Sequence, residues 1–225
     1  MTQRPHTDQS ADGSGAALAL VLAEVLATRL CHDLAGCLGT LMGALELAND
    51  DPSMLDEALP VAREAAEVLG ARLRLIRTAW GRLDTPMSGA ELRNLASGLP
   101  VGRRVTVELD GIALQRSFSP DAARLLLNLL MLGVESLAGE GVLAMAEMPG
   151  GEFVLGLSGP RAAWPSGFAA MLTDPQIALK AAADQGARHL QGPLVALIAH
   201  SSGRRVALLL AARAEAAPPL IVSLG

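Results

Sequence analysis

The feature that most constrains this chain is a long stretch near its N-terminus that contains no proline. Residues 16–48 carry apolar side chains at steps of three and four positions, which is the spacing of one face of an α-helix. Residues 49–52 (NDDP) then supply a turn, and a second helical pattern runs to about Leu83, with Ser53 as its expected N-cap. Pro60 lies early in that pattern, where it is expected to kink the helix or to shift its start.

Two helices joined by a short loop form an antiparallel hairpin, which by itself is half of a four-helix bundle. The second helix carries a wide apolar stripe made of Leu55, Leu59, Leu69, Leu73, Ile76, Trp80 and Leu83. A second copy of the chain would supply the other two helices of the bundle. We therefore predict that residues 16–84 form a dimerisation domain and that the protein is a homodimer.

From Met87 onward the pattern changes to short helices and strands. Ser119 and Pro120 are typical of a helix N-cap and first turn, and residues 149–151 (PGG) are typical of a hairpin between two strands. Helices are expected near residues 89–97, 119–138, 175–184 and 187–199, and strands near 104–110, 142–148, 152–158, 205–211 and 219–224. This arrangement predicts an α+β fold for residues 85–225.

Charge and hydropathy argue against two classes of partner. The net charge of −5 leaves no basic excess to neutralise phosphates, so nucleic-acid binding is not expected. The apolar run at 16–27 is short and is interrupted by Glu24, so no membrane segment is expected. Residues 1–15 are polar and aperiodic and are predicted to be a disordered leader. Two cysteines, Cys31 and Cys37, make no disulfide framework and suit a cytoplasmic protein.

His32 lies midway along the first predicted helix, opposite its bulky apolar face. On a wheel that advances about 100° per residue, that apolar face holds Leu26, Leu30, Leu34, Cys37, Leu38, Leu41 and Leu45. The side chains beside His32 are small or polar instead: Thr28, Arg29, Ala35, Gly36, Gly39, Gly43 and Glu46. Glycines in a helix cost roughly 1 kcal/mol each relative to alanine, and close approach by another protein would offset that cost. The plain alternative is a surface histidine on a glycine-rich helix.

The chemistry of imidazole suits such an exposed position. The ring is a nucleophile near neutral pH, and a phosphoryl group on its nitrogen transfers readily. Asp33 could accept a hydrogen bond from the ring nitrogen that does not attack, which would fix the tautomer of His32. Arg29, one turn earlier, could offset phosphoryl charge. Asp33 and Arg29 could equally be solvated charges on the helix surface.

Residues 29–34 (RLCHDL) resemble the His-Asp/Glu-Leu box in the dimerisation helix of sensor histidine kinases. Together with Gly39, Leu45 and Glu46 they more closely resemble the alphaproteobacterial histidine phosphotransferases of the ChpT type. The resemblance covers almost the whole chain after residue 16, and includes segments 71–73 (ARL), 79–81 (AWG) and 126–130 (LLNLL). The box is moderately specific alone, and the domain order behind it makes the resemblance stronger.

The resemblance implies a homodimer whose paired hairpins form a four-helix bundle, followed by a degenerate α/β sandwich like the ATP-binding domain of histidine kinases. It implies that His32 relays a phosphoryl group between receiver-domain aspartates, from a hybrid histidine kinase to response regulators of the cell cycle. The chain would bind no cofactor, and Mg²⁺ would lie on the partner receiver domain. The expected docking residues, called here the His32 patch, are Thr28, Ala35, Gly36, Gly39, Gly43 and Glu46.

An ATP-dependent histidine kinase core is the main alternative, and it needs nucleotide boxes in the second domain. One box pairs two asparagines a turn apart, one of them holding Mg²⁺. Asn128 matches the first, but Leu132 stands four positions later. Residues 157–161 (LSGPR) lack the carboxylate that reads adenine, and residues 186–190 (GARHL) do not make a glycine-rich lid. Asn128 is therefore interpreted as a polar helix residue, and the phosphotransferase is favoured over the kinase.

Other candidate sites are weaker. Cys31 and Cys37 lie about 100° and 140° around the helix from His32, so one helix cannot bring the three onto a metal ion. His189 and His200 are interpreted as structural or solvated because neither has a paired carboxylate in the predicted helix. A dimer that docks receiver domains without chemistry remains a further alternative.

Overall fold

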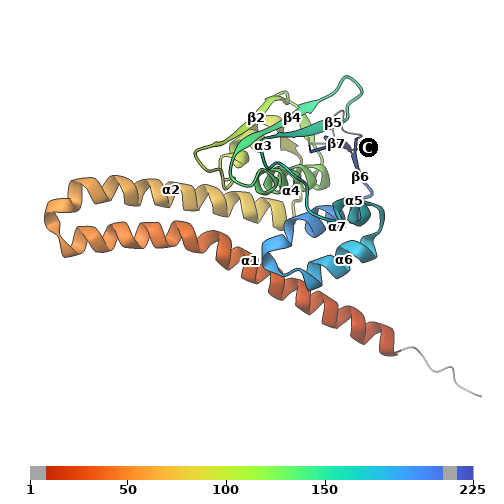
Figure 1. Ribbon diagram of the computed structural model, residues 1–225, viewed down its shortest axis with the longest axis horizontal. Coiled ribbons are helices and arrows are strands. Elements are labelled where there is room, and N and C mark those ends of the chain that lie inside the picture. Colours follow the sequence, from red (N-terminus) through yellow and green to blue (C-terminus); the bar gives the residue numbers. More distant parts are fainter. Residues whose placement is uncertain (1–8, 210–216, 225) are drawn as a thin grey trace, which may run out of the picture.

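The computed structural model describes residues 9–209 and 217–224 and begins with an α-helical hairpin. Helix α1 (Gln9–Asp50) and helix α2 (Leu55–Trp80) run antiparallel and project beyond the rest of the molecule (Figure 1). α1 starts inside the stretch predicted to be disordered, because residues 9–15 contain no proline and a formed helix extends at little cost. The remainder of that predicted leader, residues 1–8, lies outside the described residues.

The turn between the two helices differs from the prediction at its cap. One 3₁₀ turn, η1 (Pro52–Met54), separates α1 from α2. Asp51 caps it in place of the predicted Ser53, since Asp51 Oδ1 accepts hydrogen bonds from Ser53 N at 2.9 Å and from Ser53 Oγ at 2.6 Å. An aspartate before proline can satisfy the backbone N–H two residues later, so Ser53 is the capped residue rather than the cap.

Helix α2 is continuous through Pro60, which lies in its second turn. A proline this close to a helix start removes one backbone hydrogen bond without ending the helix. α2 ends at Trp80 rather than at Leu83, because Gly81 takes an extended conformation with ψ of 178° while its N–H still donates to Arg77 O.

The rest of the chain contains the predicted helices and strands and some short elements that the sequence did not predict. Ser119 caps the long helix that follows it, and its Oγ accepts from Ala122 N at 3.4 Å. The element bounds are β1 (Met87–Ser88), α3 (Gly89–Ala96), β2 (Val105–Gly111), β3 (Ser117–Phe118), α4 (Pro120–Ser136), β4 (Gly141–Glu147), β5 (Phe153–Ser158), α5 (Phe168–Thr173), α6 (Pro175–Asp184), η2 (Ala187–His189), α7 (Gln191–Ser201), β6 (Arg205–Leu208) and β7 (Leu220–Ser223).

Three details differ from the sequence-based expectation. The short helix α5 and the two-residue strands β1 and β3 are additional, and they are too short to produce a periodic pattern. The helix predicted at 187–199 is divided into η2 and α7. The strand predicted at 205–211 is β6 over 205–208, and its last two predicted residues lie outside the described residues.

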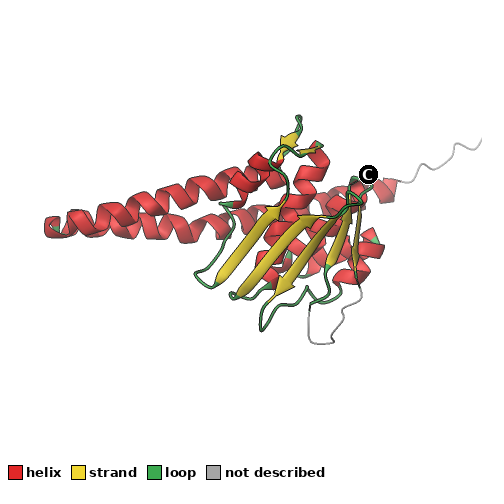
Figure 2. Ribbon diagram, turned by 90° about the horizontal axis from the view of Figure 1, so that it is seen from above, coloured by secondary structure: helices red, strands yellow, loops and turns green. Residues whose placement is uncertain are grey.

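Five strands form one sheet in the order β2-β4-β5-β7-β6. β2 pairs parallel to β4, with α4 as the crossover between them, and the other pairs are antiparallel. The helices lie along one face of this sheet (Figure 2). α4 is buried along almost its whole length because it lies between the sheet on one side and α2 and α7 on the other. The predicted α+β class is confirmed.

The hairpin and the sheet domain meet along α2 and the middle of α1. Asn128 Nδ2 on α4 donates to Ala79 O on α2 at 2.8 Å, and Arg72 Nε on α2 donates to Gly98 O at 2.6 Å. α1 contacts α6 and η2 of the sheet domain. This contact places His32 of α1 beside the 185–189 segment. Across the described ranges, no helix is long and apolar enough to cross a membrane.

Candidate functional site

His32 is exposed in the middle of α1, with 64% of its side chain accessible. Gly36, Gly39 and Gly43 follow on the same side, and a Cβ atom built on any of them would meet nothing within 4 Å. Packing within the described chain therefore does not require glycine at these positions. The other members of the His32 patch, Thr28, Ala35 and Glu46, are exposed as well. The patch predicted from the helical wheel is an open surface in the structure.

Asp33 lies beside the imidazole of His32. Its Oδ1 is 3.6 Å from His32 Nδ1, and its Oδ2 accepts a hydrogen bond from Arg29 Nε at 2.8 Å. The first distance is longer than a hydrogen bond, as is common for catalytic pairs before a substrate is bound. Asp33 is only 12% exposed, so it is not the solvated surface charge that was the alternative interpretation.

Arg29 is the largest departure from the helical-wheel prediction. It was expected beside His32 on the open face, yet it is buried, with 9% of its surface exposed. Its guanidinium pairs with Asp33 and Glu135, and its Nη1 donates to the carbonyl oxygens of Ala187 and Arg188 at 3.2 Å each. The sheet domain covers this flank of α1, which a wheel drawn for one helix cannot reveal. The contact of Arg29 with a phosphoryl group stays a prediction.

Burial and charge change the ionisation of this cluster. Burial raises the pKa of Glu135, and the nearby Arg29 only partly opposes that rise. Burial by itself would lower the pKa of Arg29, but the carboxylates of Glu135 and Asp33 outweigh it, so the net shift is upward. Arg29 therefore stays charged, and it holds two carboxylates from different helices.

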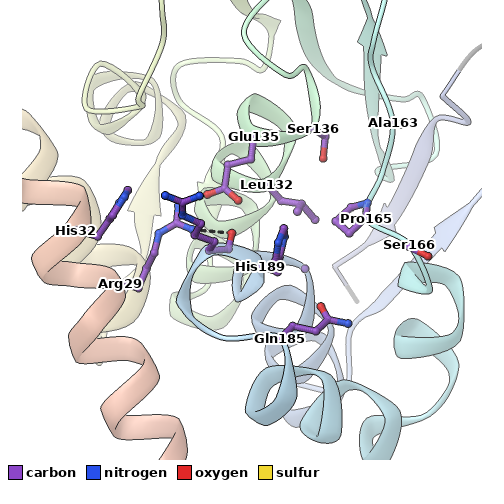
Figure 3. Close-up of a pocket in the computed structure, with 12 residues that line it drawn as sticks. Arg29, His32, Leu132, Glu135, Ser136, Ala163, Pro165, Ser166, Gln185 and His189 are labelled. Atoms are coloured by element: carbon purple, nitrogen blue, oxygen red, sulfur yellow. Dashed lines mark hydrogen bonds and ion pairs between the residues drawn. The ribbon is translucent and has the colours of Figure 1, made fainter. Parts of the chain in front are cut away.

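A cavity of about 800 Å³ opens between α1 and the sheet domain, with His32 at its edge (Figure 3). Arg29 and Glu135 lie beside His32, and His189 and Gln185 come from the segment that connects α6 to α7. The remaining lining residues are Leu132, Ser136, Ala163, Pro165, Ser166, Arg188 and Gly192. A smaller cavity of about 360 Å³ also contains His32, together with Thr28, Arg188 and His189.

Sequence reasoning missed Glu135, Arg188 and His189 as neighbours of His32. His189 was interpreted as structural or solvated, and it lines both cavities instead. These three residues lie more than 100 positions from His32 along the chain, and no local pattern links them to it. His200 is held by Met171 O at 3.1 Å from its Nε2, in keeping with a structural role.

The residues of the expected nucleotide box have other partners. Asn128 is fully buried, and its Nδ2 donates to Ala79 O and Arg124 O at 2.8 Å each. Its Oδ1 accepts from Gln191 Nε2 at 3.0 Å. Asn128 therefore joins α2, α4 and α7, which agrees with its interpretation as a polar helix residue. Among the residues that the structure describes, no group of three or more His, Cys, Asp or Glu side chains could hold a metal ion.

Residues 89–214 match the family model of the histidine phosphotransferase C-terminal domain. This match covers more than half of the chain. The chain belongs to the histidine phosphotransferase family. Its role is therefore in phosphotransfer, and the resemblance noted in the sequence is confirmed at the level of the family.

Solved structures similar to this family member also include phosphotransfer proteins. A bacterial phosphotransferase solved at 1.7 Å aligns with a TM-score of 0.67 at 20% identity, over 98% of this chain and all of the other. A histidine kinase domain from the blue-light activated kinase of Erythrobacter litoralis EL346 aligns with a TM-score of 0.42 at 12% identity, over 84% of this chain and 95% of that one. The full-length kinase ShkA in complex with AMPPNP aligns with a TM-score of 0.40 at 15% identity, over 88% of this chain and 44% of that one. The search of curated proteins returns no match.

The first of these alignments extends from the hairpin to the last strand. It shows that the order of a helical hairpin followed by an α+β domain is shared with a solved phosphotransferase. The family match itself begins at Gly89, after the hairpin that carries His32.

Proposed function

We propose that the protein is a phosphorelay intermediate that carries a phosphoryl group on His32. The donor would be the aspartyl phosphate of a receiver domain on a hybrid histidine kinase, and the acceptors would be receiver aspartates of response regulators, with cell-cycle regulators as the class that the resemblance implies. One observation carries the proposal: His32 is exposed on an open glycine-rich surface of a chain in the histidine phosphotransferase family.

The geometry favours Nε2 of His32 as the nucleophile, since Nδ1 faces Asp33. In the forward step the Nε2 lone pair attacks phosphorus, the bond between phosphorus and the acyl oxygen breaks, and the receiver aspartate leaves as a carboxylate. In the return step the carboxylate of a second receiver attacks phosphorus and the nitrogen–phosphorus bond breaks. No ATP takes part in either step, and Mg²⁺ is supplied on the receiver.

The His32 patch is the proposed docking surface for the receiver. Its glycines let a partner backbone approach α1 closely, because no side chain stands between the partner and the helix. Thr28 and Glu46 lie at the two ends of this surface and would contact the edge of the receiver's interface. Such a surface is compatible with several receivers, which a relay between one donor and several acceptors requires.

A homodimer is the proposed assembly, with two hairpins forming a four-helix bundle. Many large apolar side chains of the hairpin are exposed in the single chain, namely Leu38, Met42, Leu45, Leu47, Leu55, Leu59, Val61, Val68 and Leu73. Exposed apolar side chains in such number are typical of a protein interface. Leu38 and Leu45 belong to the face opposite His32 on the wheel, so pairing through them would leave His32 accessible. The expected location is the cytoplasm, where receiver domains are found.

The test is phosphotransfer from a radiolabelled receiver domain of a hybrid kinase to the purified protein. We expect acid-labile label to appear on the wild type and to be absent from His32→Gln, which keeps size and polarity. Label that never reaches the wild type, or that still reaches His32→Gln, contradicts the relay.

An ATP titration of the purified protein and a signalling test of His32→Gln in cells separate the two alternative functions. A kinase core with a divergent site would bind ATP·Mg²⁺ saturably, and we expect a flat calorimetric titration. A dimer that only docks receivers would support signalling in cells with His32→Gln, whereas a relay would not.

A further inference from the structure

We propose that Glu135 is a positioning residue for His32, acting through Arg29 and Asp33. The inference rests on the proposed function, because it concerns how the phosphoryl-accepting histidine is prepared. Glu135 lies on α4 and is more than 100 positions from His32 in the sequence. The three side chains Glu135, Arg29 and Asp33 are called here the ion chain.

Arg29 is the centre of the ion chain and is held from several directions. Its Nη2 pairs with Glu135 Oε1, and its Nε donates to Asp33 Oδ2 at 2.8 Å. Its Nη1 donates to Ala187 O and Arg188 O at 3.2 Å each. A planar guanidinium with partners on both of its terminal nitrogens and on Nε has little freedom to rotate. The position of Arg29 is therefore determined by the sheet domain, and Glu135 is the charged anchor there.

Asp33 transmits this position to the imidazole. One carboxylate oxygen is bound by Arg29, which leaves Oδ1 directed at His32 Nδ1 at 3.6 Å. A modest side-chain rotation of His32 closes that distance to a hydrogen bond, since His32 is exposed and free to turn. An Nδ1–H bond to Asp33 leaves the lone pair on Nε2, the atom that attacks phosphorus.

The charges of the ion chain favour the same tautomer. Two carboxyl groups share one guanidinium, so with Glu135 ionised the ion chain carries one net negative charge in a mostly buried position. If Glu135 were neutral, Arg29 would be paired with Asp33 alone, and Asp33 would be a weaker acceptor for His32. Arg188 and His189 are the other titratable side chains that line the cavity beside His32.

The decisive variant is Glu135→Gln, which preserves shape and removes the charge. We expect the rate of phosphotransfer to His32 to fall about tenfold, the scale on which loss of a residue that orients a histidine is felt. Side-chain ¹⁵N chemical shifts report the tautomer of His32, whose resonance is assigned by its absence in His32→Gln. We expect the Nδ1–H population to fall in Glu135→Gln.

Glu147→Gln is the matched control, because Glu147 is also a partly buried carboxylate paired with an arginine, Arg116, at 2.9 Å. This control should keep both the rate and the His32 tautomer. In an Asp33→Asn background, Glu135→Gln should cause no further change in the tautomer, because the effect passes through Asp33.

Two outcomes would overturn the inference. One is an unchanged His32 tautomer in a folded Glu135→Gln protein, whether or not the rate of phosphotransfer falls. The other is a Glu147→Gln protein that loses as much of the phosphotransfer rate or of the Nδ1–H population as Glu135→Gln does. If Glu135→Gln does not fold, the same tautomer measurement on Glu135→Asp decides, and an unchanged spectrum there counts against the proposal. Failure of the relay itself is distinct, because it appears as label that never reaches the wild type or that still reaches His32→Gln, whatever the tautomer.

Discussion

His32 and Arg29 are three positions apart on α1, yet their side chains differ sharply in exposure to solvent. His32 is exposed, while Arg29 is enclosed by Asp33, Glu135 and two backbone carbonyls. An arginine so enclosed costs desolvation, which its carboxylate partners must repay. His32, the proposed phosphoryl acceptor, thus stays accessible, and its neighbours are held by the second domain.

Glu135 gives this cluster a specific dependence on pH. Burial raises its pKa above the ordinary value near 4.5, so the folded protein binds a proton more tightly than the unfolded chain. As the pH rises from the ordinary value through the folded pKa, the unfolded chain has already released the proton that the folded protein still holds. The free energy of unfolding therefore falls through that window.

Glu135→Gln removes this titration. We expect the unfolding free energy of the wild type, minus that of Glu135→Gln, to decrease as the pH rises from the ordinary value through the raised folded pKa of Glu135 and then to level off. Urea unfolding of both proteins at a series of pH values and at one protein concentration measures this difference in unfolding free energy. A difference that rises with pH would show that the attraction of Arg29 outweighs burial.

At the scale of elements, one side of α1 packs against the rest of the molecule and the other side is exposed. Its contacts with α2, α6 and η2 lie on the flank that carries Arg29 and Ala44, while a Cβ atom built on Gly36, Gly39 or Gly43 would meet nothing within 4 Å. A helix usually avoids glycine in its interior, and these residues belong to the surface that is proposed to dock a receiver domain.

Gly39 is the position at which stability and docking can be separated. Gly39→Ala should stabilise the protein by up to about 1 kcal/mol, because alanine favours the helix and its Cβ meets no atom. Gly39→Leu should also keep the fold but slow phosphotransfer, because the leucine side chain would lie on the proposed docking surface. Thermal unfolding and transfer rates measure the two effects.

Gly15→Leu is the control for that pair, since Gly15 is an equally open glycine of α1 far from His32. Its transfer rate should match the wild type. Phosphotransfer to Gly39→Leu at the wild-type rate would show that the His32 patch is not the docking surface.

At the scale of the whole molecule, the hairpin and the sheet domain differ in how well their apolar side chains are covered. Much of its apolar surface has no partner within the described chain, whereas α4 in the sheet domain is almost completely buried. A second hairpin would cover that surface and complete a bundle of four helices.

Charged residues on that surface should break the assembly. Leu38→Asp combined with Leu45→Asp should convert a dimer into a monomer, because both side chains are about half exposed in one chain and would be buried in the bundle. Light scattering coupled to size exclusion measures the mass. Leu114→Asp is the matched control, since Leu114 is equally exposed but lies in the sheet domain. A monomeric wild type, or a dimeric double variant, contradicts the proposed assembly.

Local pattern was enough to predict most elements of the fold. Helical spacing predicted the hairpin, and Ser119 with Pro120 predicted the start of α4, because caps and periodicity depend on neighbours in sequence. The same reasoning assigned the cap after the first helix to Ser53, whereas Asp51 is the cap in the structure. Both side chains can accept a hydrogen bond from a backbone N–H, and local pattern did not distinguish them. It also missed β1, β3 and α5, which are held by contacts with the rest of the domain.

The sequence by itself determined that His32 lies opposite the bulky apolar face of its helix, that glycines flank it and that Asp33 follows it, since all three are properties of one helix. Only the tertiary structure decided that Arg29 is buried and that Glu135, Arg188 and His189 come to the same cavity. The physical reason is that these residues meet through the packing of the sheet domain against α1. A contact across more than 100 positions leaves no periodicity in the chain.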